Sequence, residues 1–167
     1  MFHRIEDFEK TYAQQVEMTG KVLATLTDQN LAQPVAEGHR TLGHIAWHVV
    51  ATVPEMMNRT GLGLSSIDQE APPPTVAREI IDGYQKVTSE LLQSLKENWT
   101  DETLGQVDDM YGMKWPRSMT LRILIDHEIH HRGQMTVLLR QAGAKVPGVM
   151  GPSKEEWTAF GMDAPAY

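Results

Sequence analysis

The stretch that decides the fold is residues 118–143, SMTLRILIDHEIHHRGQMTVLLRQAG. Ser118 is of a residue type that caps helix N-termini, and Gly143 is of the type that ends a helix in the left-handed conformation. Between them, five apolar residues recur at the spacing of one helix face: Leu121, Leu124, Met135, Leu138 and Leu139. The stretch therefore predicts one long amphipathic helix.

Two histidines of this helix share its inward face. His131 falls within the apolar stripe and His127 on its edge, whereas His130 projects about 100° away from His131. A pair of histidines at i and i+4 can place two ring nitrogens about 2.0–2.1 Å from one metal ion. Because two ligands are too few for a stable site, we expect a third ligand from another segment.

A second histidine pair, His44 and His48, lies far upstream in TLGHIAWHVV. The apolar stripe of that segment consists of Leu42, Ile45, Val49, Val53 and Met56. His48 lies nearer to this stripe than His44, so it is the better candidate for the third ligand. Three histidines would leave one coordination position open, as in catalytic rather than closed structural sites. The alternative is that such pairs are ordinary core or surface residues, and we assign that role to His44 and His130.

Composition limits the class of protein. A chain of 167 residues suits a single domain, here 1–167. The net charge of −7 repels phosphate backbones, so nucleic acid is not an expected partner. The absence of cysteine excludes a thiolate ligand or a protein thiol nucleophile. No apolar run approaches the length of about 18 residues that crosses a membrane, and the first residues lack a signal peptide pattern, so we expect a cytoplasmic protein without membrane contact.

The rest of the chain predicts an all-α bundle. Apolar residues at helical spacing indicate three further long helices, at about residues 3–30, 41–58 and 75–98. Thr41 and Thr75 are the expected caps of the last two. A stiff connection around Pro72–Pro74 joins them and could cross the bundle. We also expect a short strand or hairpin within residues 99–116 and a short terminal helix that begins at Ser153.

Several strings occur in one order over most of the chain: Thr41–Gly43 with Trp47–His48, then DHEIHHRGQ at residues 126–134, then Gly151–Ser153. In these strings the chain resembles the DinB/YfiT superfamily, and HxxHHRGQ is a fairly specific part of the resemblance. The resemblance implies a four-helix bundle of up-down-down-up type with a long second crossover. It also implies a homodimer.

The same resemblance implies a metal triad of one histidine from the second helix and two from the fourth. Carried over to this chain, these are His48, His127 and His131, the set that the helical wheel also favours. The ion implied is Zn²⁺ or Ni²⁺, and imidazole ligands suit both. Relatives include S-transferases and isomerases that use bacillithiol, mycothiol or glutathione, and proteins described as metal-dependent hydrolases.

The sequence therefore predicts a metal-dependent enzyme, a thiol S-transferase or a hydrolase, that acts on a small molecule. The ion would lower the pKa of a thiol or of water. Glu128, next to His127 but about 60° from His131 on the wheel, is the candidate general base. Arg132 and Gln134 are expected to fix the helix through hydrogen bonds. The alternative is a non-catalytic, metal-containing binding or stress protein.

Overall fold

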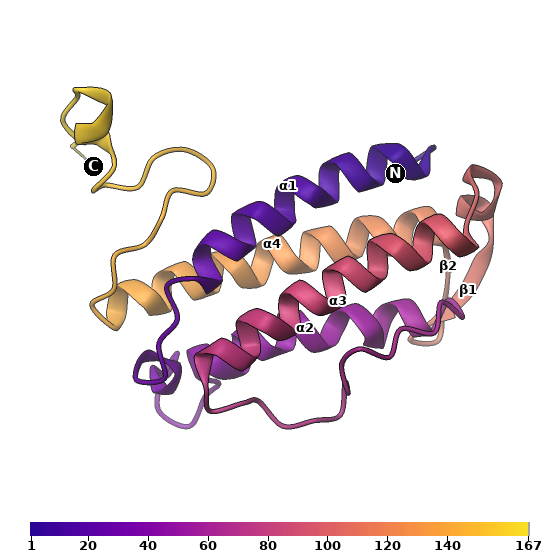
Figure 1. The fold of residues 1–167 in the computed structure, drawn as a ribbon, viewed down its shortest axis with the longest axis horizontal. Coiled ribbons are helices and arrows are strands. Elements are labelled where there is room, and N and C mark those ends of the chain that lie inside the picture. Colours follow the sequence, from indigo (N-terminus) through magenta and orange to yellow (C-terminus); the bar gives the residue numbers. More distant parts are fainter. Residues whose placement is uncertain (167) are drawn as a thin grey trace.

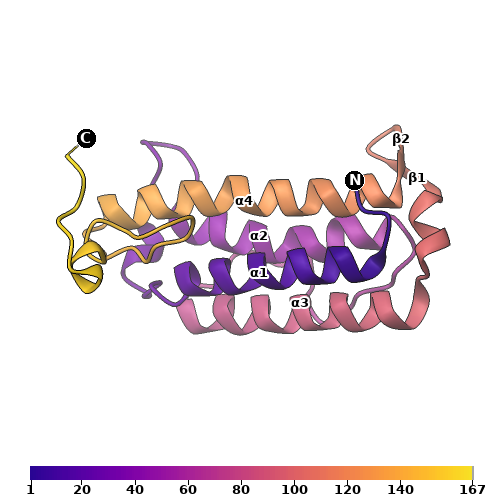
Figure 2. The same cartoon turned by 90° about the horizontal axis from the view of Figure 1, so that it is seen from above.

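Four long helices make up most of the chain in the computed structural model, which describes residues 1–166. They are α1 (Ile5–Leu23), α2 (Leu42–Asn58), α3 (Ala77–Asn98) and α4 (Arg117–Gln141). Helix α2 packs against α3 and α4, and α1 packs against the same two helices from the other side (Figures 1 and 2). The all-α bundle predicted from the sequence is confirmed.

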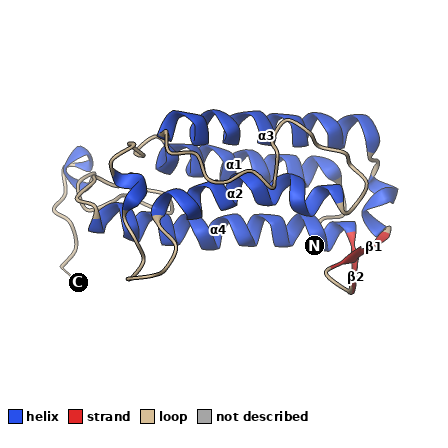
Figure 3. Ribbon diagram, turned by 90° about the horizontal axis from the view of Figure 1, so that it is seen from below, coloured by secondary structure: helices blue, strands red, loops and turns tan. Residues whose placement is uncertain are grey.

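The directions of the helices are up, down, down and up. Helices α2 and α3 run the same way along the bundle, and α1 and α4 run the opposite way (Figure 1). Two parallel helices in sequence need a connection as long as the bundle. Residues 59–76 supply it, and Figure 3 shows this segment crossing the face of the bundle from one end to the other.

The helices enclose one apolar core along the length of the bundle. Large side chains from all four are fully buried in it, among them Phe8, Leu42, Tyr84, Leu91 and Leu121. Burial of such side chains contributes about 1.5–3 kcal/mol each. Among residues 1–166, no helix combines the length and the apolar character that a membrane crossing requires.

Helix α2 begins and ends as the sequence predicts. The Thr41 side chain accepts a hydrogen bond from the backbone N–H of His44, which satisfies an otherwise unpaired donor of the first turn. The helix continues through Pro54 to Asn58. This cap sets where the helix begins, and therefore how far along the bundle His48 lies.

The first helix is shorter than the expected range of 3–30. It ends at Leu23, and a short 3-10 helix, η1 (Asn30–Ala32), follows. The Asn30 side chain donates to the carbonyl of Thr25 and accepts from the N–H of Thr27. Such local side-chain bonds compete with the helical hydrogen bonds. Leu26 is nevertheless buried, which is why the apolar period extends past the end of the helix.

Two expected caps are wrong. Helix α3 has Val76 at its N-cap, and Asp28 rather than Thr75 accepts the hydrogen bond from the N–H of Ala77, at 2.7 Å. Helix α4 has Pro116 at its N-cap, so Ser118 lies inside the first turn. In α3 a carboxylate distant in sequence replaces the local cap. In α4 the fixed φ of Pro116 already suits the position before a helix.

A hairpin and a tail complete the chain. After the short 3-10 helix η2 (Asp101–Gly105), β1 (Val107–Met110) pairs with β2 (Met113–Pro116) in antiparallel fashion, as the alternating pattern predicts. The tail beyond Gly143 extends from the end of α4 (Figure 1) and contains the 3-10 helix η3 (Trp157–Phe160). The expected short terminal helix is present as η3, but it begins at Trp157 rather than directly after Ser153, because the Glu156 carboxylate accepts from the N–H groups of Gly148 and Ser153 and holds a turn there.

Candidate metal centre

Three histidines from two helices meet where α2 lies beside α4. The Nε2 atom of His127 lies 3.1 Å from Nε2 of His48 and 3.1 Å from Nε2 of His131. One nitrogen from each ring falls within a span of 4.8 Å. These are the three residues that the sequence selects as ligands, and the structure brings all of them together.

The packing of α2 against α4 explains why the three histidines lie together. Helices α2 and α4 run in opposite directions side by side (Figure 2), and His127 and His131 lie about one turn apart on the face of α4 toward α2. Neighbouring apolar residues on both helices, among them Ile45 and Leu124, are buried and set the rotation of each helix about its axis. The position of the site therefore follows from the same periodicity that forms the core.

The protonation states suit a metal site. Burial, and then the charge of His131, lower the pKa of His48 to about 4. Burial, and then the charges of His131 and His48, lower the pKa of His127 to about 4. Burial likewise lowers the pKa of His131. At neutral pH the rings are therefore uncharged, which is the form of imidazole that binds metal ions.

The spacing of the nitrogens also suits a single ion. With metal–nitrogen bonds of about 2.0–2.1 Å, two ligand nitrogens lie about 3.3 Å apart in tetrahedral geometry and about 2.9 Å apart at a right angle. The two observed separations of 3.1 Å lie between these values. The residues fit a small divalent cation, and these two separations are compatible with both geometries.

Gln134 contacts the His131 ring at its other nitrogen, Nδ1. Its Oε1 lies 2.7 Å from Nδ1 of His131. Because an amide oxygen can only accept, Nδ1 carries the proton and Nε2 directs its lone pair toward the other two rings. The Gln134 amide nitrogen lies 3.2 Å from Nε2 of His130, and the His130 ring also packs edge-on against His131, with ring centroids 4.8 Å apart. A hydrogen bond of this kind orients a ligating imidazole.

Comparison with known proteins places the chain in a family. The model of the DinB family matches residues 1–165. The chain belongs to the DinB family. Its sequence is 42% identical over 165 residues to the uncharacterized protein YrdA of Bacillus subtilis (strain 168), with 99% of each chain covered.

Two solved structures of DinB-like proteins resemble this member of the family. One is from Bacillus cereus ATCC 10987, with 45% identity and a TM-score of 0.86 over 89% of this chain and 99% of that one. The other is YjoA of Bacillus subtilis, with 17% identity and a TM-score of 0.68 over 86% of this chain and 97% of that one. The second likeness shows that the fold persists where little of the sequence is shared.

Glu128, the candidate general base, has its hydrogen-bond partners on other helices than the histidine group. In this DinB-family chain its Oε1 accepts hydrogen bonds of 2.6 Å from Thr19 of α1 and from Tyr84 of α3. The side chain is 2% exposed. Burial raises the pKa of its carboxyl, although the two hydrogen bonds and the charge of Arg132 oppose the shift. The carboxyl thus belongs to a buried polar network between α1, α3 and α4.

Arg132 completes that network. Its guanidinium donates to the Gln15 side chain at 2.8 Å and to the Thr19 hydroxyl at 3.0 Å, and the whole residue is 3% exposed. The expected role of Arg132 in fixing the fourth helix is therefore supported by its contacts. The partners Thr19 and Tyr84 carry no signal in the sequence, because a threonine or a tyrosine on a buried helix face does not by itself indicate what it binds.

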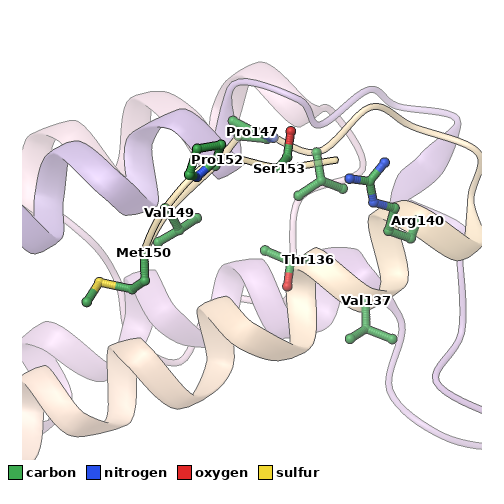
Figure 4. Close-up of a pocket in the computed structure, with 11 residues that line it drawn as sticks. Thr136, Val137, Arg140, Pro147, Val149, Met150, Pro152 and Ser153 are labelled. Atoms are coloured by element: carbon green, nitrogen blue, oxygen red, sulfur yellow. The ribbon is translucent and has the colours of Figure 1, made fainter. Parts of the chain in front are cut away.

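The exposed His44 and a surface cavity lie apart from the three-histidine group. His44 is exposed, and its Nδ1 lies 2.8 Å from the Thr41 hydroxyl, in agreement with its assignment as a surface residue. A cavity of about 330 Å³ lies between the end of α4 and residues 146–153 (Figure 4). Arg140 in its wall is bound by Glu155, with Nη2 2.7 Å from Oε2. None of the three histidines lines this cavity.

Proposed function

We propose that this DinB-family protein is a divalent-metal-dependent enzyme that acts on a small molecule, as a thiol S-transferase or a hydrolase. The observation that carries the proposal is the convergence of three uncharged imidazole nitrogens, two pairs of them 3.1 Å apart, from two helices. The chemistry of the donors suits Zn²⁺ or Ni²⁺. When bound, such an ion lowers the pKa of a water molecule or a thiol so that the nucleophile exists at neutral pH.

The chain's own residues prepare the site for this chemistry. His48, His127 and His131 hold the cation, and Gln134 keeps the His131 ring in the tautomer that can ligate. Three protein ligands leave room for a fourth group at the ion. Because the chain has no cysteine, a thiol nucleophile would have to arrive as part of a substrate.

One observation favours the alternative, a metal-containing binding or stress protein without turnover. Glu128, the candidate general base, accepts hydrogen bonds from Thr19 and Tyr84 and forms none with the histidine group. A proton acceptor for hydrolysis would then have to come from the substrate. This distinction can be tested directly.

The test begins with elemental analysis of protein purified without chelators, followed by loading with Zn²⁺ or Ni²⁺ to full occupancy. The loaded protein is then assayed for conversion of monochlorobimane with a panel of low-molecular-weight thiols, and for cleavage of simple esters and amides. We expect metal-dependent turnover in one of the two assays, which EDTA abolishes and re-addition of metal restores.

The matched controls are His48→Ala and His44→Ala, which remove histidines four residues apart on the same helix. Only the first lies in the three-histidine group. Turnover that survives His48→Ala at the wild-type rate would contradict the proposal. Full metal occupancy without conversion of any of these substrates would favour the non-catalytic alternative.

A further inference from the structure

A surface cavity continues the seam between the two segments that carry the proposed ligands. Its volume is about 180 Å³. It is lined by Val35, from the loop before α2, and by four residues of α4: Gln134, Val137, Leu138 and Gln141. This space is termed the Val35 cavity. Its two walls belong to the helix that carries His127 and His131 and to the segment that leads into the helix of His48.

The α4 wall of the Val35 cavity lies on the helix face that carries His127 and His131. Gln134, Leu138 and Gln141 follow His131 by three, seven and ten residues, which is the spacing of one helix face. Gln134 and Leu138 lie about 4.5 Å and about 10.5 Å beyond His131 along the helix axis. The near end is in direct contact with the histidines, because Oε1 of Gln134 lies 2.7 Å from Nδ1 of His131. The cavity thus begins at a side chain that touches a proposed ligand.

The opposite wall is held by the turn that starts α2. Pro34 pairs with Thr41, whose side chain caps the helix. The N–H of Val35 donates to the carbonyl of Arg40 at 3.0 Å, which closes the loop. Because α2 and α4 run in opposite directions, the segment before α2 lies beside the last turns of α4 (Figure 2). His48 and Val35 therefore face α4 at successive positions along one seam.

The lining of the Val35 cavity favours an uncharged, apolar occupant. Three of its side chains are apolar, two are amides and none is charged. Val35 and Val137 are 51% and 57% exposed, so an apolar group placed between them would remove valine surface from water. A charged group would lose part of its hydration without gaining an ion pair. The volume suits a group of about six carbon atoms, since an apolar cavity of about 150 Å³ in another protein binds benzene.

We infer that the Val35 cavity receives an uncharged, apolar group of the substrate while the reactive atom of the same molecule reaches the metal. The cavity lies on the seam that holds the three histidines, and Gln134 joins its near end to His131. The inference rests on the proposed function, because it requires a metal ion with an open position. It adds the class of substrate to that function: a small molecule with an alkyl or aryl group of about six carbon atoms.

The test uses thiols that differ only in the part distant from sulfur. Protein loaded with Co²⁺ is titrated with ethanethiol, with 1-hexanethiol and with 6-mercaptohexanoate, and binding is followed by the thiolate-to-metal charge-transfer absorption. The hexyl thiol should bind at least about tenfold more tightly than ethanethiol, since each methylene removed from water contributes up to about fourfold. The mercaptohexanoate should lose most of this gain, because its carboxylate finds no charged partner in the cavity.

Variants assign this gain to the Val35 cavity. Val35→Asp places a carboxylate in its wall and should remove most of the gain for 1-hexanethiol, with the binding of ethanethiol unchanged. Val107→Asp is the matched control: it replaces a valine of similar exposure, 58%, in β1 and should change the binding of neither thiol. Val35 is a better position for the variant than Val137, which also borders the cavity of Figure 4. Circular dichroism and metal content verify that each variant is folded and loaded.

Two binding results would overturn the inference and leave the proposed function intact: equal binding of ethanethiol and 1-hexanethiol by wild-type protein, or an unchanged gain in Val35→Asp. Sedimentation velocity gives a third. If Val35→Asp converted a wild-type dimer to a monomer, a second copy of the chain rather than a substrate would cover the cavity. Absence of the absorption band with all three thiols, at full cobalt occupancy, would show that the ion has no open position. That result would overturn the proposed function and the inference together.

Discussion

The two polar faces of α4 differ in how their groups are satisfied. Toward α1 and α3, Glu128 and Arg132 are nearly fully buried; hydrogen bonds from the same chain reach Oε1 of Glu128 and the guanidinium of Arg132, whereas Oε2 of Glu128 has no hydrogen-bond partner among residues 1–166. Toward α2, the imidazole nitrogens of His127 and His131 converge with that of His48. If all three Nε2 atoms are unprotonated, their lone pairs meet without a donor between them, and a bound cation would supply the missing partner.

The difference separates a face that is bonded mainly within the chain from the face that carries the proposed metal site. A buried network in which most polar groups are hydrogen-bonded within the chain contributes to stability, and its partial removal is costly. A half-buried set of nitrogens directed at a common point contributes little until an ion binds, and then binding stabilises the folded state. Substitutions on the two faces should therefore change different measured quantities.

The largest effect is expected on the network face. Arg132→Leu removes the donors to Gln15 and Thr19 and the cation near the buried Glu128 carboxyl. The free energy of unfolding of the metal-free protein should fall by about 3–5 kcal/mol. Urea denaturation followed by circular dichroism measures this change.

The matched control for that experiment is Arg122→Leu. Arg122 is an exposed residue of the same helix, paired with Asp126 at 2.8 Å. An exposed pair contributes about 1 kcal/mol or less. If the free energy of unfolding fell by similar amounts in the two variants, the buried network would contribute no more to stability than an exposed ion pair.

On the histidine face, His48→Ala should weaken metal binding at least about tenfold, since even loss of groups that only support ligands has that effect. The free energy of unfolding of the metal-free protein should change by no more than about 1 kcal/mol. Competition with a chromophoric chelator measures the affinity. His44→Ala should leave the affinity unchanged, and a fall of the same size there would contradict the assignment of ligands.

The pattern of the sequence was sufficient to identify this face. Apolar residues at helical spacing placed His131 on the inward side of one helix and His48 on that of another, and the helices pack on those sides in the structure. The spacing could not identify the other face, because Thr19 and Tyr84 come from helices whose rotation depends on the whole core. Likewise, Asp28 caps α3 across a gap of 49 residues, which local capping rules do not detect.

The stability of the metal-free protein should depend on pH through the histidine face. The pKa of His48 and His127 in the folded state is about 4, below the usual value of about 6.5 in unfolded chains. The unfolded chain therefore takes up protons first as the pH falls, and stability is lost between about pH 6.5 and pH 4.

Thermal unfolding of the metal-free protein at pH 7 and pH 5 tests this dependence. The wild-type midpoint should fall more between these pH values than that of a double variant with His48→Gln and His127→Gln, in which those two groups do not titrate. Equal falls in the two proteins would show that other groups dominate the acid sensitivity.

The smallest effect is expected from Glu128→Gln. The glutamine oxygen can still accept from Thr19 and Tyr84, so the free energy of unfolding should change by about 1 kcal/mol or less. Metal affinity and any metal-dependent turnover should equal those of the wild type, because the carboxyl lies in the network between α1, α3 and α4. If Glu128 were instead the general base that its place beside His127 suggests, turnover would fall about 10²–10⁴-fold with affinity unchanged. A loss of that size would connect the two faces through one residue, and the division between a stabilising face and a functional face would then have to be abandoned.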